Sequence, residues 1–312
     1  MTPPQALASP DVPDRAQVVI IGGGVIGTSV AYHLAKLGWS DVVLLERDQL
    51  TSGTTWHAAG LVVSGGMTTE TLAWMTKYST DLYAALEDET GLSTGFKAVG
   101  YLQTASNPER MHKLRREADF LRLAGIEREE ISAREVADLW PHVDPTDVIG
   151  GFFTASEGRA DPYNVAMSLA AGARALGVRI VQGSPVTGVT QRDGRVTGVV
   201  TEHGTFEAEY VVNCAGMWAR QIGARAGVAA PLQAIEHAYL ITEPYDGVSP
   251  DLPIFEDPDR FAYYREETGG LMVGLYEPVA APWSIDRIPD DFSFGEIPSD
   301  WDRLAPFLEY AM

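Results

Sequence analysis

Cysteine is almost absent from this sequence, and long apolar runs are missing. Cys214 is the one cysteine among 312 residues, so the chain can form no internal disulfide and no metal site built from several cysteines. We therefore expect no metal ion, and a Cys214 thiol that is buried and inert. No run of eighteen apolar residues occurs, so insertion into a membrane is not expected.

Basic residues are also scarce. The 43 acidic residues against 23 basic ones give a net charge of −20, which argues against nucleic acid or an anionic membrane as a partner. Residues 1–15 contain four prolines and no arginine-rich leader, so we expect a disordered tail there and a cytoplasmic protein. With 45% hydrophobic residues, the chain can bury one large core or two moderate ones.

A glycine fingerprint follows the tail. The apolar run 17–21 leads into G-G-G-V-I-G, which matches G-x-G-x-x-G at Gly22, Gly24 and Gly27. In this motif the glycines make a sharp turn, let the backbone approach a pyrophosphate and let the next helix pack on the sheet. The helix predicted over 27–37 would point its free N–H groups at the phosphates.

An acidic residue completes this unit. The strand predicted over 42–45 ends at Glu46, nineteen residues after Gly27, where a carboxylate accepts the ribose hydroxyls of an adenosine and disfavours a 2′-phosphate. The order strand, turn, helix, strand and acid favours FAD or NAD over NADP. A glycine-rich turn in an ordinary βαβ unit and a nicotinamide dehydrogenase remain the alternatives at this point.

The rest of the pattern predicts an α/β chain of two interleaved domains. Helices are predicted over 73–89, 108–123, 132–139 and 163–176. Strands are predicted over 96–104, 152–159, 179–182, 186–192, 195–202, 205–208 and 210–213, and, for a second sheet, over 238–242, 260–265 and 270–275. We expect a Rossmann-like FAD-binding domain with a parallel central sheet over 16–92 and 152–230. An α+β substrate domain with a mostly antiparallel sheet is expected over 93–151 and 231–300.

Five further motifs resemble those of the sarcosine and dimethylglycine dehydrogenases, which belong to the glycine oxidase and D-amino-acid oxidase group of flavoproteins. They are T-S-G-T-T-W-H-A-A-G at 51–60, E-D-E-T-G at 87–91, G-R-A-D-P at 158–162, V-V-N-C-A-G at 211–216 and E-H-A-Y at 236–239. The similarity runs in order from about Val18 to about Leu304, and the tryptophan-histidine motif is its most specific part.

The resemblance implies FAD, bonded covalently through the histidine that matches His57. A neutral imidazole is a competent nucleophile toward the flavin ring methyl when a loop holds it there. On sequence alone, a histidine packed beside its tryptophan is the alternative. The cofactor-binding residues are expected to be Gly22, Gly24, Ile26, Gly27, Glu46, Arg47, Thr54, Thr55, Trp56, His57, Ala59, Gly60, Val186, Ala215, Gly216 and Trp218.

The resemblance also implies the reaction. A hydride leaves the carbon beside the nitrogen of a small N-methyl amine of the sarcosine or dimethylglycine type, and the iminium hydrolyses to formaldehyde and the demethylated amine. The electrons would pass to a carrier flavoprotein or to oxygen. A non-catalytic flavin-binding or regulatory protein of the same fold is the alternative function.

Four residues are candidates for the substrate side. In relatives a histidine and a tyrosine beside the substrate match His237 and Tyr263. His237 and Tyr239 are expected on one strand, and Tyr263 and Arg265 on the next. Each pair should share a face, since residues two apart on a strand point to the same side. Cross-strand packing is the alternative for these side chains, and an exposed ion pair is the alternative for Arg265. Tyr264 is expected to point the other way.

The chain departs from the family at its end. No folate-binding domain follows, so free formaldehyde would be the product. Relatives continue to another glycine-rich segment, so we expect a truncated chain in which 301–312 is an unfinished amphipathic helix.

Overall fold

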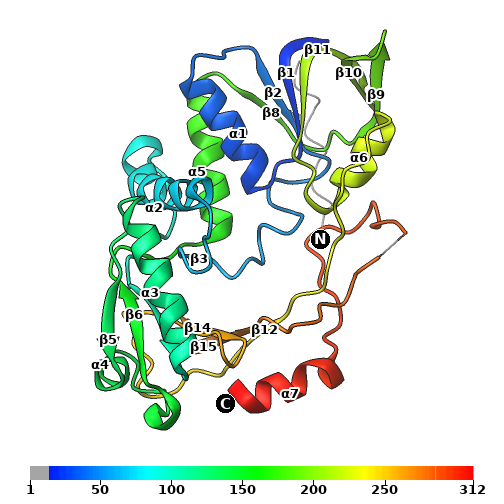
Figure 1. Cartoon of the computed structure of the whole chain (residues 1–312). Coiled ribbons are helices and arrows are strands. Elements are labelled where there is room, and N and C mark those ends of the chain that lie inside the picture. The colour runs from blue at the N-terminus through cyan, green and yellow to red at the C-terminus, as the bar shows by residue number, and fades with distance from the viewer. Residues whose placement is uncertain (1–13, 285, 312) are drawn as a thin grey trace.

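The computed structural model describes residues 14–284 and 286–311, so the predicted tail lies almost wholly outside the described residues. Two large sheets organise the chain, one above the other in Figure 1. The helices are α1 Val25–Lys36, α2 Glu70–Thr90, α3 Pro108–Arg122, α4 Ala133–Leu139, α5 Pro162–Ala175, α6 Ala219–Arg225 and α7 Trp301–Ala311. No helix within the described ranges is long and apolar enough to cross a membrane.

The first sheet has six strands in the order β8-β2-β1-β11-β10-β9. They are β1 Arg15–Ile21, β2 Val42–Leu45, β8 Arg179–Val181, β9 Val186–Arg192, β10 Arg195–Thr201 and β11 Gly204–Asn213. The four strands from β8 to β11 are parallel, and β10 and β9 add an antiparallel ribbon. Alternate residues of β1 face opposite sides. Val18 and Ile20 pack under α1 and α5, while Val19 and Ile21 pack toward α6.

The second sheet has seven strands in the order β12-β15-β14-β13-β4-β6-β5. They are β4 Tyr101–Ala105, β5 Glu129–Ser132, β6 Gly150–Thr154, β12 Tyr239–Ile241, β13 Ile254–Asp257, β14 Ala262–Glu267 and β15 Gly270–Leu275. All pairs are antiparallel except β13 with β4. Residues of α4 and α7 pack on one face. The opposite face points toward the first sheet, while α7 lies below (Figure 1).

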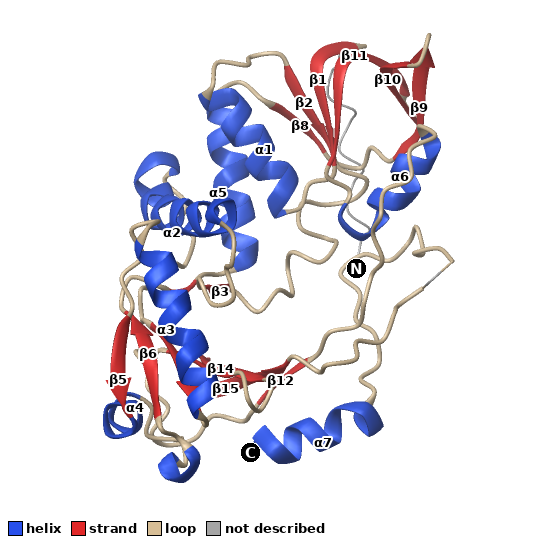
Figure 2. Cartoon of the chain, viewed as in Figure 1, coloured by secondary structure: helices blue, strands red, loops and turns tan. Residues whose placement is uncertain are grey.

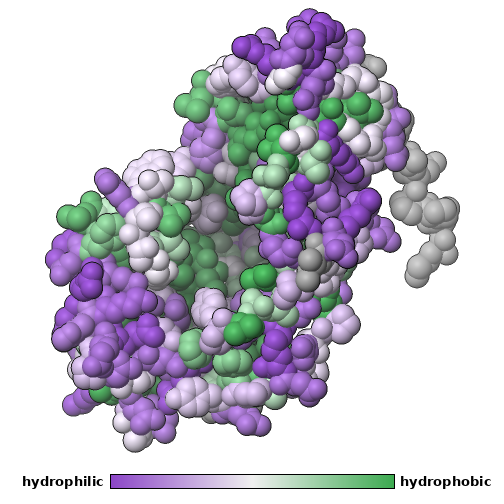
Figure 3. Space-filling view, turned by 45° about the vertical axis from the view of Figure 1, so that its right-hand side comes forward, coloured by the Kyte–Doolittle hydropathy of each residue, from purple (hydrophilic) through white to green (hydrophobic). Residues whose placement is uncertain are grey.

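The chain passes between the sheets through the loop after β2, through α5 and through the loop from α6 to β12 (Figure 2). A short pair, β3 Leu61–Val62 with β7 Gly158–Arg159, lies between the sheets. Figure 3 shows the surface hollowed between the upper and lower parts, with apolar residues in its wall. The predicted α/β class with a parallel nucleotide-type sheet and a mostly antiparallel second sheet is confirmed, whereas the domain bounds stay a prediction.

Several element predictions need correction. The two strands predicted over 205–208 and 210–213 are one strand, β11, because β1 pairs with it from Glu207 to Asn213. The strand predicted from residue 96 begins at Tyr101, and α1 begins two residues before the predicted start. Strands β3, β5 and β13 and helix α6 were not predicted, because elements of two to seven residues carry little periodic signal.

The packing of α2 gives a stability prediction. Leu86 is fully buried in the core beneath the first sheet, so Leu86→Ala should lower the free energy of unfolding by about 2–5 kcal/mol. Leu72 lies on the same helix but is 43% exposed, so Leu72→Ala, the control, should change it by less than about 0.5 kcal/mol. Urea denaturation followed by circular dichroism measures both, and equal losses would contradict this packing.

Candidate functional site

The glycine fingerprint forms a turn in which backbone lies directly on backbone. Gly22 has a positive φ of 106°, and a Cβ there would lie 2.3 Å from the carbonyl oxygen of Cys214. A Cβ on Gly27 would lie 1.9 Å from the carbonyl oxygen of Gly22. No side chain fits at either position, so β1, α1 and the end of β11 meet through glycine alone.

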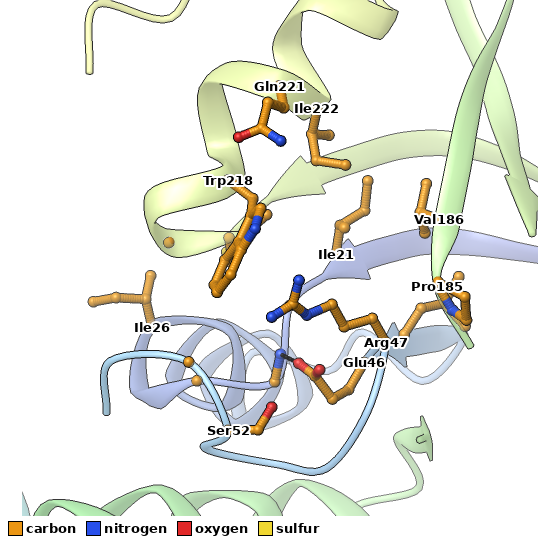
Figure 4. A pocket seen from close by; sticks show the side chains of 18 of the residues that line it. Ile21, Ile26, Glu46, Arg47, Ser52, Pro185, Val186, Trp218, Gln221 and Ile222 are labelled. Atoms are coloured by element: carbon orange, nitrogen blue, oxygen red, sulfur yellow. Dashed lines mark hydrogen bonds between the residues drawn. The ribbon is translucent and has the colours of Figure 1, made fainter. Parts of the chain in front are cut away.

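A cavity of about 350 Å³ opens above this turn. The N-terminus of α1 borders it, and the Val25 N–H donates to the Thr55 hydroxyl over 3.0 Å. Of the predicted cofactor residues, eleven line the cavity: Gly22, Gly24, Ile26, Glu46, Arg47, Thr54, Thr55, Val186, Ala215, Gly216 and Trp218. Figure 4 shows lining side chains from residues 21–52 and from residues 185–222 converging on one space. Helix N–H groups, small residues and an acid around one cavity fit a dinucleotide.

Glu46 is held at the floor of the cavity. Its carboxylate accepts the N–H of Gly23 over 2.7 Å and the N–H of Asp48 over 2.9 Å, and Figure 4 draws the first of these bonds. Burial raises the pKa of Glu46, while the two backbone bonds oppose that shift. Each carboxylate oxygen keeps a second acceptor position, so the group is placed to take further donors such as hydroxyls.

Arg47 and Trp218 form the cavity's outer wall. Figure 4 shows the two side chains next to each other. The guanidinium lies 3.7 Å from the centre of the indole ring and donates to the carbonyl oxygen of Asp290 over 2.6 Å. The indole N–H donates to the carbonyl oxygen of Pro289 over 2.9 Å. Residues 288–292 therefore run along the cavity, although the sequence placed them in the substrate domain.

The second half of the tryptophan-histidine motif, residues 56–60, lies beside the cavity and does not line it. Trp56, His57, Ala59 and Gly60 belong to the turn-rich segment that leads into β3. The rings of Trp56 and His57 lie 4.7 Å apart. His57 therefore packs beside its tryptophan, which is the contact expected under the alternative to a flavin bond. Burial lowers the pKa of His57, and the charge of Glu296 acts against it. The imidazole is therefore neutral at pH 7, as a nucleophile must be.

The inner face of the second sheet meets this motif. Arg265 donates from Nε to the carbonyl oxygen of Ala59 over 2.6 Å and pairs with Glu267 over 2.7 Å. The alternative of an exposed ion pair is wrong in one respect, because the Arg265 side chain is only 9% exposed. Its guanidinium is committed to joining the sheet to the motif.

Tyr263 shares that face with Arg265. Its hydroxyl lies 3.4 Å from Nε2 of His237. His237 precedes β12, so the prediction that His237 and Tyr239 lie on one strand is wrong. Tyr276, which sequence reasoning missed, packs its ring 5.0 Å from that of Tyr263 and 6.1 Å from that of His237. Tyr264 points the other way, as predicted, and packs on Phe255.

We call His237, Tyr263 and Tyr276 the ring cluster. Burial lowers the pKa of His237 and raises that of Tyr263. The imidazole is therefore neutral near pH 7 and the phenol keeps its proton. Tyr239 lies at the edge of this group, half-buried, with its pKa raised by burial. An adjacent acceptor and donor are what a proton relay needs.

Cys214 lines the cavity and is only partly buried, so the prediction of a buried thiol is wrong. Burial raises its pKa to about 11, which leaves the thiol protonated and unreactive at neutral pH. Sequence reasoning missed other lining residues, among them Ser52, Pro185, Gln221 and Ile222. Within the described ranges, no group of three His, Cys, Asp or Glu side chains is placed to hold a metal ion.

Comparison with known proteins supports this reading of the cavity. Residues 17–311 match the model of a family described as FAD dependent oxidoreductase. The chain belongs to that family. Its fold is also that of L-proline dehydrogenase from P. horikoshii, with a TM-score of 0.83 and 24% identity over 96% of this chain and 77% of that one.

Family members with longer chains are similar over nearly all of this one. The sequence is 39% identical to human mitochondrial sarcosine dehydrogenase over 96% of this chain and 33% of the relative. It is 36% identical to the formaldehyde-forming 4-methylaminobutanoate oxidase of Paenarthrobacter nicotinovorans over 95% of this chain and 36% of the relative. The mouse regulatory subunit of pyruvate dehydrogenase phosphatase is 37% identical over 95% of this chain and 34% of that relative. The chain thus spans about a third of these relatives' length, and the resemblance to the sarcosine dehydrogenase group is confirmed.

The turn predicts the effect of a single methyl group on cofactor binding. Gly27→Ala places a Cβ against the Gly22 carbonyl, so we expect FAD affinity to fall by about a hundredfold or more, since the turn must open to relieve the clash. Gly188→Ala is the control, because its Cβ would lie 3.4 Å from the Val200 side chain, an ordinary contact, and Gly188 does not line the cavity. Fluorescence titration of apoprotein with FAD measures both variants. Unchanged affinity in Gly27→Ala would show that the turn does not carry the site.

Proposed function

We propose that this chain carries out the flavin-dependent oxidation of a small N-methyl amine, with formaldehyde as the one-carbon product. The observation that carries the proposal is the contact between Arg265 and Ala59. It joins the face that bears Tyr263 to the segment that bears His57, so the two predicted groups lie on parts of the chain that are in direct contact. The names of the relatives, sarcosine dehydrogenase and a formaldehyde-forming oxidase, agree with this chemistry.

The cavity would hold the adenosine and diphosphate end of FAD. Glu46 would accept ribose hydroxyls, and the α1 N-terminus above Gly24 would face the phosphates. The ring would extend toward His57, which would bond to it covalently. When bound, FAD supplies the acceptor for the hydride.

The ring cluster would manage the proton of the substrate amine. An ammonium has no lone pair, so the amine must lose its proton before a hydride can leave the adjacent carbon. His237, neutral because burial lowers its pKa, can accept that proton, and the Tyr263 hydroxyl at 3.4 Å can relay it. Tyr239 would shape the pocket beside them.

Other parts of the proposal come from the sequence and the relatives. The expected substrate is of the sarcosine or dimethylglycine type. The expected electron acceptor is a carrier flavoprotein or oxygen, and the expected compartment is the cytoplasm. A regulatory role is the second candidate, because the similar mouse regulatory subunit carries that name.

Anaerobic reduction tests the activity. Addition of sarcosine or dimethylglycine to the yellow holoprotein should bleach its visible absorption, because the hydride moves to the flavin. Glycine, which has no N-methyl group, is the control and should leave the spectrum unchanged. A holoprotein that stays yellow with every N-methyl amine would favour the regulatory candidate.

Acid precipitation tests the tether. Yellow colour should stay with the precipitated wild type and appear in the supernatant of His57→Ala, since only a covalent bond survives denaturation. His33→Ala is the control, because His33 lies on α1 and bonds to Tyr78, away from the motif. A colourless precipitate from flavin-replete wild type would falsify covalent attachment.

A further inference from the structure

A short segment between β15 and α7 forms one side of the cofactor cavity. Residues 288–294, which we call the strap, include Asp290, and Asp290 lines the cavity. Most of the other lining residues come from the first sheet and its turns, from α1 and from α6. All strap residues lie within the described ranges, and none is in a helix or strand. The strap is therefore the part of the cavity wall that lacks backbone ladders of its own.

Two cavity side chains hold the middle of the strap through its backbone. Arg47 donates to the carbonyl oxygen of Asp290 over 2.6 Å and also to that of Phe292. The indole N–H of Trp218 donates to the carbonyl oxygen of Pro289 over 2.9 Å, and the indole ring packs on the same guanidinium. Arg47 and Trp218 both line the cavity, so the cavity wall and the strap depend on the same two side chains.

Further contacts hold the two ends of the strap. At the first end, the side-chain amide of Gln221 exchanges two hydrogen bonds with the backbone of Ile288, over 3.1 and 3.2 Å. Ile288 is the one strap side chain that is buried, at 3% exposed. Near the other end, the Ser293 hydroxyl donates to the carboxylate of Asp48. A segment held by polar contacts and a single apolar side chain opens locally at low cost in free energy.

The last residue of the strap has a strained backbone. Phe294 has a φ of 44°, a left-handed conformation that bulky residues rarely adopt. Its N–H donates to the carbonyl oxygen of Ser52 over 2.8 Å, and its ring lies edge-on to that of Trp56 at 5.9 Å. Such a conformation persists only where surrounding contacts impose it, so opening of the strap would release strain that the closed form holds.

We propose that the strap is the gate through which the dinucleotide enters and leaves the cavity. Closed, the strap forms one wall of the space that would hold the adenosine and diphosphate. Open, it uncovers that side while the first sheet and its helices stay in place. The same opening precedes entry and exit, so the strap sets the rate of both. The inference rests on the proposed function for the place of the cofactor, and it needs neither the amine reaction nor the covalent bond.

Release of FAD from a cross-linked strap tests the gate. The background carries His57→Ala and Cys214→Ser, which remove any tether and the one native thiol. Asp48→Cys and Ser293→Cys, introduced together, place two thiols where the native side chains are hydrogen-bonded, and a short thiol-specific cross-linker joins them in the holoprotein. We expect FAD release, followed as the rise of flavin fluorescence after dilution, to slow by about tenfold or more.

Matched variants separate the cross-link from the substitutions and the reagent. Asp48→Cys alone and Ser293→Cys alone, treated with the same reagent, should release FAD no more slowly than the background protein. Ile288→Ala removes the buried strap side chain, so it should speed release by about fivefold. Val279→Ala should leave the rate unchanged, because Val279 lies in the loop before the strap and is 81% exposed.

The outcomes separate the gate from the proposed function. Equal release from the cross-linked and untreated double variant overturns the gate, and so does a pair of thiols that cannot be joined, since the strap would then not lie on Asp48. Slower release after cross-linking supports the gate even in a protein that no amine reduces, because no turnover is measured. A background protein that holds no FAD also overturns the gate, since the strap then retains nothing, whereas bleaching by N-methyl amines tests the reaction alone.

Discussion

The close approach of two pieces of backbone determines where everything else in the candidate site lies. At the end of β1 the chain turns over the Cys214 carbonyl, and Gly22 and Gly27 leave no side chain in between. The turn presents the N–H of Gly23 to Glu46 and directs the start of α1 toward the cavity. A backbone surface of this kind offers donors without competing side chains, which suits a phosphate group.

A buried guanidinium joins the two halves of the site. Arg265 is tied to Ala59 of the motif segment and to Glu267 of its own strand. Breaking such a pair inside the protein leaves an uncompensated charge, so the geometry is strongly held. Arg265 therefore helps to fix the ring cluster relative to His57, and its side chain is unavailable as a substrate clamp.

The sequence was sufficient for the first half of the site because that half is contiguous. Strand, glycine turn, helix and Glu46 follow one another within thirty residues, and each has a local physical signature. The segment 288–292 has no such signature, since its contacts with Arg47 and Trp218 use backbone carbonyls.

Buried carboxylates show where this acidic chain gains from a ligand. Burial raises the pKa of Glu46 and of Glu256, so each holds its proton more tightly in the folded chain than in the unfolded one. The stability that each contributes is full below the ordinary carboxyl pKa and is lost as pH rises through the raised value. Above the raised pKa the ionised carboxylate costs folding free energy. Hydroxyl donors at Glu46 would offset that cost, so binding there stabilises the fold as well as the complex.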